Sequence, residues 1–202
     1  MGVTIARPRI PNHVRHSAAP DRHREPRCNS SRVTAPTRVE QDSTQLLRLT
    51  PRHGTSSLAE VAYRLVGPVD APVVVVQGGI SANRAAGTLS NVPQPTPWWP
   101  QVVGDGLAID TARVRVLSLE WLTPADYTSA DTDETAQPPR AVTTDDQADA
   151  LAALLSKLGI ERIAAYVGSS YGGMVALAFA ARYPSLIGRL VVISAAHRAH
   201  PC

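Results

Sequence analysis

The segment VGSSYGG, residues 167–173, constrains this chain more than any other. It places Ser170 between glycines, directly after an apolar run and directly before the helix-like run MVALAFAARYP. This is the G-x-S-x-G pattern of a nucleophile elbow, a sharp strand-to-helix turn that strains the serine backbone and requires small neighbours. The N-terminus of the following helix favours developing negative charge. The segment therefore predicts that Ser170 is a candidate nucleophile at the end of a buried strand.

The alternative is a glycine-rich turn that only packs tightly or that binds a phosphate group. A dinucleotide-binding loop would need G-x-G-x-x-G, and a P-loop would end in Gly-Lys-Ser or Gly-Lys-Thr. Neither pattern is present here. We favour the elbow because the strand and the helix that it requires are both indicated on its two sides.

Apolar runs alternate with helical patterns along the rest of the chain, which predicts a parallel α/β sheet. The run PVVVVQGG is typical of a strand buried on both faces. Thr144 as N-cap and Gln147 at N3 have the form of a capping box, which marks the start of a helix. The predicted strands are 61–65, 73–77, 114–119, 163–167 and 190–194, and the predicted helices are 145–158 and 171–183.

An elbow needs an oxyanion hole, a pair of N–H groups that bind the negative oxygen of the reacting carbonyl. The N–H of Tyr171 is one candidate donor. The other is expected in the loop after an earlier buried strand, here 77–81, where two glycines let the backbone approach a carbonyl closely. The N–H of Ile80 or Gly79 is the second candidate, and the alternative is a simple strand-end turn.

The basic residues are concentrated at the N-terminus. Residues 1–52 hold 10 Arg against 4 Asp or Glu, whereas the chain as a whole has a net charge of only +3. Repeated prolines and little apolar periodicity predict that residues 1–45 form a disordered tail and that 46–202 form the folded domain. Three functional interpretations of this tail are possible. The tail has no apolar region of the kind that a secretory signal needs, and its prolines oppose the amphipathic helix of a transit peptide. Its charge alone permits a nucleic-acid-binding arm, but we favour a plain tail.

The remaining composition narrows the class of protein. No apolar run approaches the length of about 20 residues that a membrane-spanning helix needs. Cys28 and Cys202 are far apart in sequence and have no neighbours at metal-ligand spacing. A disulfide framework and a metal site are therefore not expected, and a reducing, cytoplasmic location is the simpler interpretation.

Three longer segments resemble the homoserine O-acyltransferases between about Leu58 and His200. They are VVVVQGGISANR, WWPQVVGDGLAIDTARVRVLSLEWL, and AVTTDDQADALAALLSKLGIERIAAYVGSSYGGMVALAFAARYPSLIGRLVVIS. The Trp-Trp pair and the GDG, IDT and TTDDQ motifs are more specific than the elbow alone. Two segments differ from many members: Tyr171 stands where methionine is common, and residues 120–124, EWLTP, replace a Gly-Gly-rich segment that contains Thr-Gly.

The resemblance implies an α/β-hydrolase fold and an enzyme of methionine biosynthesis that acylates a hydroxyl amino acid. It implies that Ser170 is the nucleophile, and that the N–H groups of Ile80 and Tyr171 form the oxyanion hole. The implied reaction is a ping-pong transfer of an acetyl or succinyl group from acyl-CoA to homoserine or serine. The implied partners are these small molecules, with no cofactor besides the acyl-CoA co-substrate, no metal, no nucleic acid and no membrane, and with a homodimer for the full-length protein.

The catalytic partners of Ser170 are not evident in this chain. In this fold an Asp or Glu and then a His follow the serine, but the 32 residues after Ser170 contain no Asp or Glu. We interpret His197 and His200 as the start of a lid segment. We therefore expect the N-terminal part of an α/β-hydrolase domain that ends before the Asp and His strands, an incomplete and inactive fragment. The alternatives are an esterase or peptidase, and a non-catalytic remnant or binding protein.

Overall fold

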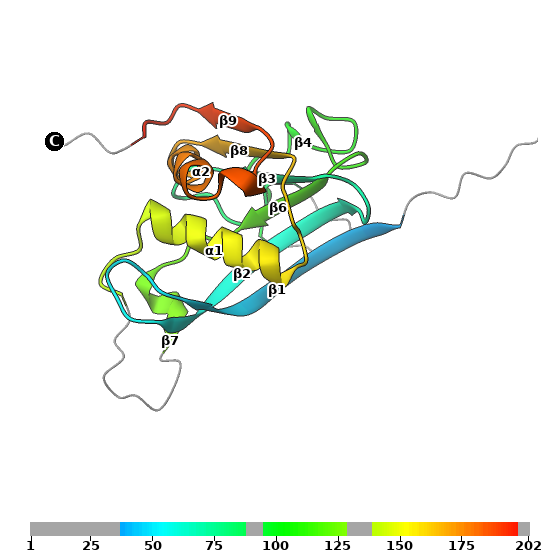
Figure 1. Ribbon diagram of the computed structural model, residues 1–202. Helices are drawn as coiled ribbons and strands as arrows, with labels where there is room; N and C mark the ends of the chain where they lie inside the picture. Colours follow the sequence, from blue (N-terminus) through cyan, green and yellow to red (C-terminus); the bar gives the residue numbers. More distant parts are fainter. Residues whose placement is uncertain (1–36, 88–94, 129–138, 198–202) are drawn as a thin grey trace, which may run out of the picture. The chain divides into compact units, whose positions relative to one another are not determined.

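The computed structural model describes residues 37–87, 95–128 and 139–197. These residues belong to one compact unit, Ala35–Cys202. Figure 1 shows a twisted sheet with helices α1 (Thr144–Lys157) and α2 (Tyr171–Arg182) packed beside each other. Within the described residues, no helix is both long enough and apolar enough to cross a membrane.

The main sheet has seven strands in the order β1-β2-β6-β3-β8-β9, and β7 pairs with β2. The pairs β6–β3, β3–β8 and β8–β9 are parallel, whereas β1 and β7 pair antiparallel with β2, and β2 pairs antiparallel with β6. The strands are β1 (Arg38–Leu49), β2 (Ser57–Pro68), β3 (Val73–Gln77), β6 (Arg115–Leu119), β7 (Tyr127–Thr128), β8 (Ala165–Ser169) and β9 (Leu190–Ile193). This arrangement confirms the predicted α/β-hydrolase fold with a mostly parallel centre.

Side-chain alternation divides the core between the two faces of the sheet. The face that carries α1 and α2 buries Tyr63, Val75 and Tyr166 together with the leucines of α1. The opposite face is covered by the crossover between β3 and β6, which contains the short pair β4 (Val103–Gly104) and β5 (Ile109–Asp110). Its smaller core consists of Val76, Ala86, Val103 and Val116, with Trp98 and Trp99 packed against it. Both tryptophans are partly buried and help to hold the crossover against the sheet.

The predicted start of the folded domain was too late in the chain. Residues 38–45 belong to β1, which runs without interruption to Leu49 and pairs with β2 along its whole length. This strand is polar because it lies at the edge of the sheet, and only Leu47 and Leu49 are buried. Residues 1–36, including Cys28, lie outside the described residues, so disorder of the tail stays a prediction. Residues 129–138 and Cys202 also lie outside them.

The start of α1 is one residue earlier than predicted. Thr143, not Thr144, is the N-cap: its side chain accepts from the Asp146 N–H, and the Asp146 carboxylate accepts from the Thr143 N–H at 2.7 Å. Either threonine satisfies the sequence pattern, since an acidic or amide side chain follows three residues after each. Because Asp146 takes the N3 position, Gln147 is not part of the cap, and its side chain forms hydrogen bonds with the backbone of Leu122 instead.

A buried ion network connects β1, β2 and the crossover. Arg64 is 3% exposed and donates to the Asp42 carboxylate at 2.6 Å, and Arg84 donates to the same carboxylate at 2.6 Å. Arg84 also reaches Glu120 at 3.1 Å. Burial by itself would raise the pKa of Asp42, but the hydrogen bonds and charges of the two arginines outweigh it and lower that pKa.

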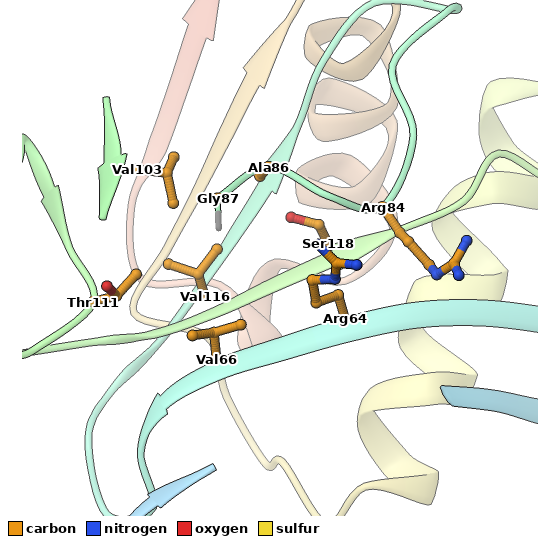
Figure 2. A pocket seen from close by; sticks show the side chains of 9 residues that line it. All are labelled: Arg64, Val66, Arg84, Ala86, Gly87, Val103, Thr111, Val116 and Ser118. Carbon is orange, nitrogen blue, oxygen red and sulfur yellow. The ribbon is translucent and has the colours of Figure 1, made fainter. Parts of the chain in front are cut away.

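Figure 2 shows Arg64, Arg84 and Ser118 beside a cavity on the crossover face of the sheet. The cavity has a volume of about 10 Å³, close to that of a single water molecule. The Ser118 hydroxyl lines this cavity but donates its hydrogen bond to the carbonyl of Val76 at 2.7 Å. The cavity is too small for an amino acid or an acyl group.

We expect Asp42→Asn to lower the free energy of unfolding at neutral pH by about 3 kcal/mol, because it removes the carboxylate that pairs the buried Arg64 guanidinium and the partly buried Arg84 guanidinium. The lowered pKa means that this carboxylate stabilises the fold above its unfolded pKa, and that the contribution is lost as pH falls through the folded value. Denaturant unfolding between neutral pH and acid should therefore show a weaker acid dependence in the variant. Asp70→Asn, at an exposed turn position, is the control; parallel pH curves for Asp42→Asn and the unchanged chain would refute the assignment.

The corrected boundary predicts different outcomes for two truncations. Removal of residues 1–36 leaves β1 whole and should leave the melting temperature unchanged. Removal of 1–45 deletes most of β1 together with Asp42 and should lower the melting temperature clearly, because β2 loses its antiparallel partner. Circular dichroism on both truncated chains measures the difference, and equal melting temperatures would show that β1 does not contribute to stability.

Candidate active site

The candidate site lies where the carboxyl ends of two central strands meet. Strands β3 and β8 are parallel neighbours, and Gln77 is in register with Gly168. The loop that begins at Gly78 and the turn that holds Ser170 therefore leave the same edge of the sheet. The Val-rich strand and the strand before the elbow are therefore adjacent.

Ser170 is strained in the way that the elbow pattern predicts. It has φ 52° and ψ −120°, it is exposed, and it is the N-cap residue of α2. Its N–H donates to the carbonyl of Ile193 at 2.9 Å, and its carbonyl accepts from the N–H of Gly173 at 3.0 Å. A positive φ in a non-glycine residue is uncommon and is retained only where the surrounding structure enforces it. Here β9 on one side and α2 on the other hold the turn.

The glycines on both sides of Ser170 are required by close backbone approaches. A Cβ atom on Gly168 would lie 2.3 Å from the carbonyl oxygen of Gly172. A Cβ atom on Gly172 would lie 2.4 Å from the carbonyl oxygen of Gln77 and 2.6 Å from that of Gly78. The first turn of α2 thus contacts the end of β3 directly, and the Gly172 N–H donates to the Gly78 carbonyl at 2.8 Å.

This contact brings the loop after β3 beside the serine. The position of a Cβ atom on Gly79 would be 3.9 Å from Ser170 Oγ. Ile80 follows, with its side chain 69% exposed. Within the described part of the chain, neither the Ile80 N–H nor the Tyr171 N–H has a hydrogen-bond acceptor. The structure therefore brings all three predicted site residues to one edge of the sheet.

Tyr171 has one aromatic contact, with Trp121, and one polar contact, with Gln147. Its ring meets Trp121 edge-on, with 4.8 Å between ring centroids. Burial raises the pKa of its phenol, and a hydrogen bond with Gln147 acts in the opposite direction. Gln147 also brackets Leu122, since its amide donates to the Leu122 carbonyl at 2.8 Å and accepts from the Leu122 N–H at 3.1 Å.

A buried tyrosine, Tyr166, lies beside the last residue of β3, Gln77. Tyr166 is fully buried on β8, and its hydroxyl donates to the side-chain oxygen of Gln77. Burial raises the pKa of Tyr166 well above its ordinary value, so the phenol stays neutral. The pair fixes Gln77 directly before the glycine loop and supplies no general base.

Sequence reasoning missed Trp121 and the role of Gln147. No local pattern marks Trp121, because its partners Gly79 and Tyr171 are distant in sequence. The TTDDQ segment did contain Gln147, but only as a capping residue. His197 is exposed and His200 lies outside the described residues.

The model of the α/β-hydrolase fold family matches residues 72–201. With the sheet order and the strained Ser170 turn, this places the chain in the α/β-hydrolase family. Among its relatives, the homoserine O-succinyltransferase of Xanthomonas campestris pv. campestris is 41% identical over 156 residues, which cover 77% of this chain and 39% of that protein. A serine O-succinyltransferase of the same species is 34% identical over 164 residues, 74% of this chain and 42% of that protein.

Solved structures agree on the fold. The homoserine O-acetyltransferase from Bacillus anthracis aligns with a TM-score of 0.63 at 22% identity, over 78% of this chain and 47% of that one. Esterase E22 aligns with a TM-score of 0.62 at 25% identity, over 79% of this chain and 48% of that one. The chain thus spans about two fifths of the length of the two relatives and about half of each structure.

The approach of α2 to β3 predicts a sharp difference between two glycines. Gly172→Ala should lower the free energy of unfolding by about 3 kcal/mol, because the new methyl group would meet two backbone carbonyls that cannot move independently. Gly79→Ala is the matched control, since its methyl group would have only ordinary contacts with Ser170 at 3.8 Å and 3.9 Å. Chemical denaturation of both variants measures the difference, and equal stabilities would contradict the contact.

Proposed function

We propose that this chain carries the nucleophile and the oxyanion hole of an O-acyltransferase that transfers an acyl group from acyl-CoA to homoserine or serine. The observation that carries the proposal is the strained, exposed Ser170 beside two N–H groups that have no acceptor among the described residues. The similarity to homoserine and serine O-succinyltransferases supports acyl transfer to a hydroxyl amino acid and favours a succinyl donor.

In the first half-reaction, Ser170 Oγ attacks the thioester carbonyl of acyl-CoA. A bond forms between Oγ and the acyl carbon, the carbon–sulfur bond breaks, and CoA leaves as a thiol after it takes the serine proton from a general base. The N–H groups of Ile80 and Tyr171 stabilise the negative oxygen of the tetrahedral intermediate. In the second half-reaction, the hydroxyl oxygen of the amino acid bonds to the acyl carbon and gives its proton to the base. The bond between Ser170 Oγ and the acyl carbon breaks, and the base returns the proton to Oγ.

The general base is not provided by the residues gathered at this edge. A serine hydroxyl without a base is a weak nucleophile, and a site without its triad partners retains only binding and oxyanion stabilisation. We therefore propose that turnover requires additional polypeptide, consistent with the share of the relatives that this chain spans. Substrates, acyl donor and any dimer are part of this proposal.

A chimera tests the proposal. Residues 1–202 are joined to the part of the Xanthomonas campestris homoserine O-succinyltransferase that follows its matched segment. We expect the chimera to release CoA from succinyl-CoA in the presence of homoserine or serine, and to form an acyl-enzyme that mass spectrometry locates on Ser170. The 202-residue chain alone should show negligible turnover, because no base is supplied.

Ser169 offers the matched control, since it is the neighbouring serine of the same motif. Ser170→Ala should reduce CoA release by a factor on the order of 10⁴ or more, because the nucleophile is lost, whereas Ser169→Ala should retain activity. Activity that survives Ser170→Ala would show that the nucleophile is wrongly assigned. A chimera that hydrolyses simple esters and never acylates an amino acid would favour the esterase alternative, and one without either activity would favour a non-catalytic role.

A further inference from the structure

One side chain outside the predicted site contacts both halves of the proposed oxyanion hole. Trp121, in the segment after β6, donates from its indole Nε1–H to the carbonyl oxygen of Gly79 at 2.9 Å. The same ring packs edge-on against Tyr171. The tryptophan is 8% exposed, so its position is fixed by packing. The indole therefore connects the loop after β3 to the first residue of α2.

The carbonyl that Trp121 binds belongs to the same peptide unit as the Ile80 N–H. A trans peptide is planar, and its C=O and N–H groups point in opposite directions. The Ala82 N–H also donates to the Gly79 carbonyl at 2.9 Å, so two donors hold this oxygen. Holding the oxygen on one side fixes the direction of the N–H on the other side, and polarisation through the peptide strengthens that N–H as a donor.

Other contacts at these two residues provide little restraint. Gly79 has no side chain, and the Ile80 side chain is mostly exposed. A glycine-rich loop has many backbone conformations available to it, so an oxyanion donor there needs an external restraint. The Gly79 carbonyl is the group through which the fold can supply that restraint.

The segment that presents Trp121 is itself anchored on both sides. Before it, the Glu120 carboxylate accepts from the Arg84 backbone N–H at 3.3 Å and from the Arg84 guanidinium at 3.1 Å. After it, the Leu122 backbone is bracketed by the buried side chain of Gln147. The indole is thus presented by a fixed backbone, which is what the positioning of a catalytic group requires.

We propose that Trp121 is a positioning residue for the oxyanion hole. Its indole N–H orients the Ile80 N–H toward the acyl carbonyl, and its ring holds Tyr171, which supplies the second N–H. This inference rests on the proposed function, because it requires Ser170 as nucleophile and these two N–H groups as donors.

Single-turnover acetylation of the 202-residue chain by p-nitrophenyl acetate tests the inference. Ser170 Oγ forms a bond with the acetyl carbon, the ester carbon–oxygen bond breaks, p-nitrophenolate leaves, and the serine proton passes to the buffer base. Oxyanion stabilisation persists in a site without its triad partners, and the acetyl group should accumulate because no base activates water to remove it. Mass spectrometry of the Ser170 peptide measures the rate, with Ser170→Ala as the background.

Trp121→Phe removes the indole donor and keeps an aromatic ring against Tyr171. The matched control is Trp98→Phe, which also removes an indole hydrogen bond, to the Asn83 carbonyl at 3.0 Å. The Trp98 ring lies beside Gly78, but its indole N–H does not bond the Gly79–Ile80 peptide. We expect acetylation of Ser170 to slow by a factor on the order of ten or more in Trp121→Phe, since a misdirected oxyanion donor loses much of its effect. The rate in Trp98→Phe should be unchanged.

Nuclear magnetic resonance provides a readout that does not depend on reactivity. The Gly79 carbonyl carbon and the Ile80 amide nitrogen should shift in Trp121→Phe and stay in place in Trp98→Phe, because only the first variant loses the hydrogen bond at that peptide. The same spectra show whether each variant is folded. Unchanged Gly79 and Ile80 resonances in a folded Trp121→Phe chain would overturn the inference.

The two proposals fail in different ways. If Ser170 is acetylated equally fast with and without the Trp121 indole, the inference is wrong and the proposed function stands. If the chimera keeps its CoA release after Ser170→Ala, or carries the acyl group at another residue, the proposed nucleophile is wrong and the inference falls with it.

Discussion

The site depends on the direct contact between the first turn of α2 and the end of β3. At Gly172 the two backbones approach so closely that no side chain fits, and a hydrogen bond of 2.8 Å from its N–H to the Gly78 carbonyl joins them. Because Ser170 begins the helix and Gly79 continues the loop, this contact sets the distance between the serine and the neighbouring N–H groups. The positive φ of Ser170 follows, since the chain must leave β8 and enter α2 within one residue.

A network of ion pairs connects the edge strand β1 to the segment that follows β6. Asp42 on β1 binds Arg64 on β2 and Arg84 in the crossover, and Arg84 binds Glu120 after β6. Burial of a charge is costly unless it is paired, so these groups must occupy fixed relative positions. The polar edge strand, which contributes little apolar surface, is therefore connected through Arg84 to the segment that carries the candidate positioning residue, Trp121.

The sequence predicted the centre of this fold well and its margins poorly. The valines of β3 and the elbow at Ser170 are encoded locally, by a run buried on both faces and by glycines at a strained turn. Strand β1 was missed because an edge strand with alternating polar residues resembles a loop. Trp121 could not have been found, because its function would depend on Gly79 and Tyr171, which only the parallel crossovers bring close to it.

Tyr171 and the segment 120–124, the two departures that the resemblance to the homoserine O-acyltransferases indicates, are in contact with each other. A tyrosine at position 171 presents a large ring, against which Trp121 packs edge-on, and a hydroxyl whose pKa is raised by burial and lowered by Gln147. A glycine-rich segment at 120–124 would supply neither the ring against Tyr171 nor the indole donor to Gly79. The differences are therefore physically coupled: a bulkier residue after the candidate nucleophile is accompanied by a bulkier, hydrogen-bonding residue after β6, and together they fill and fix the same space beneath the candidate oxyanion hole.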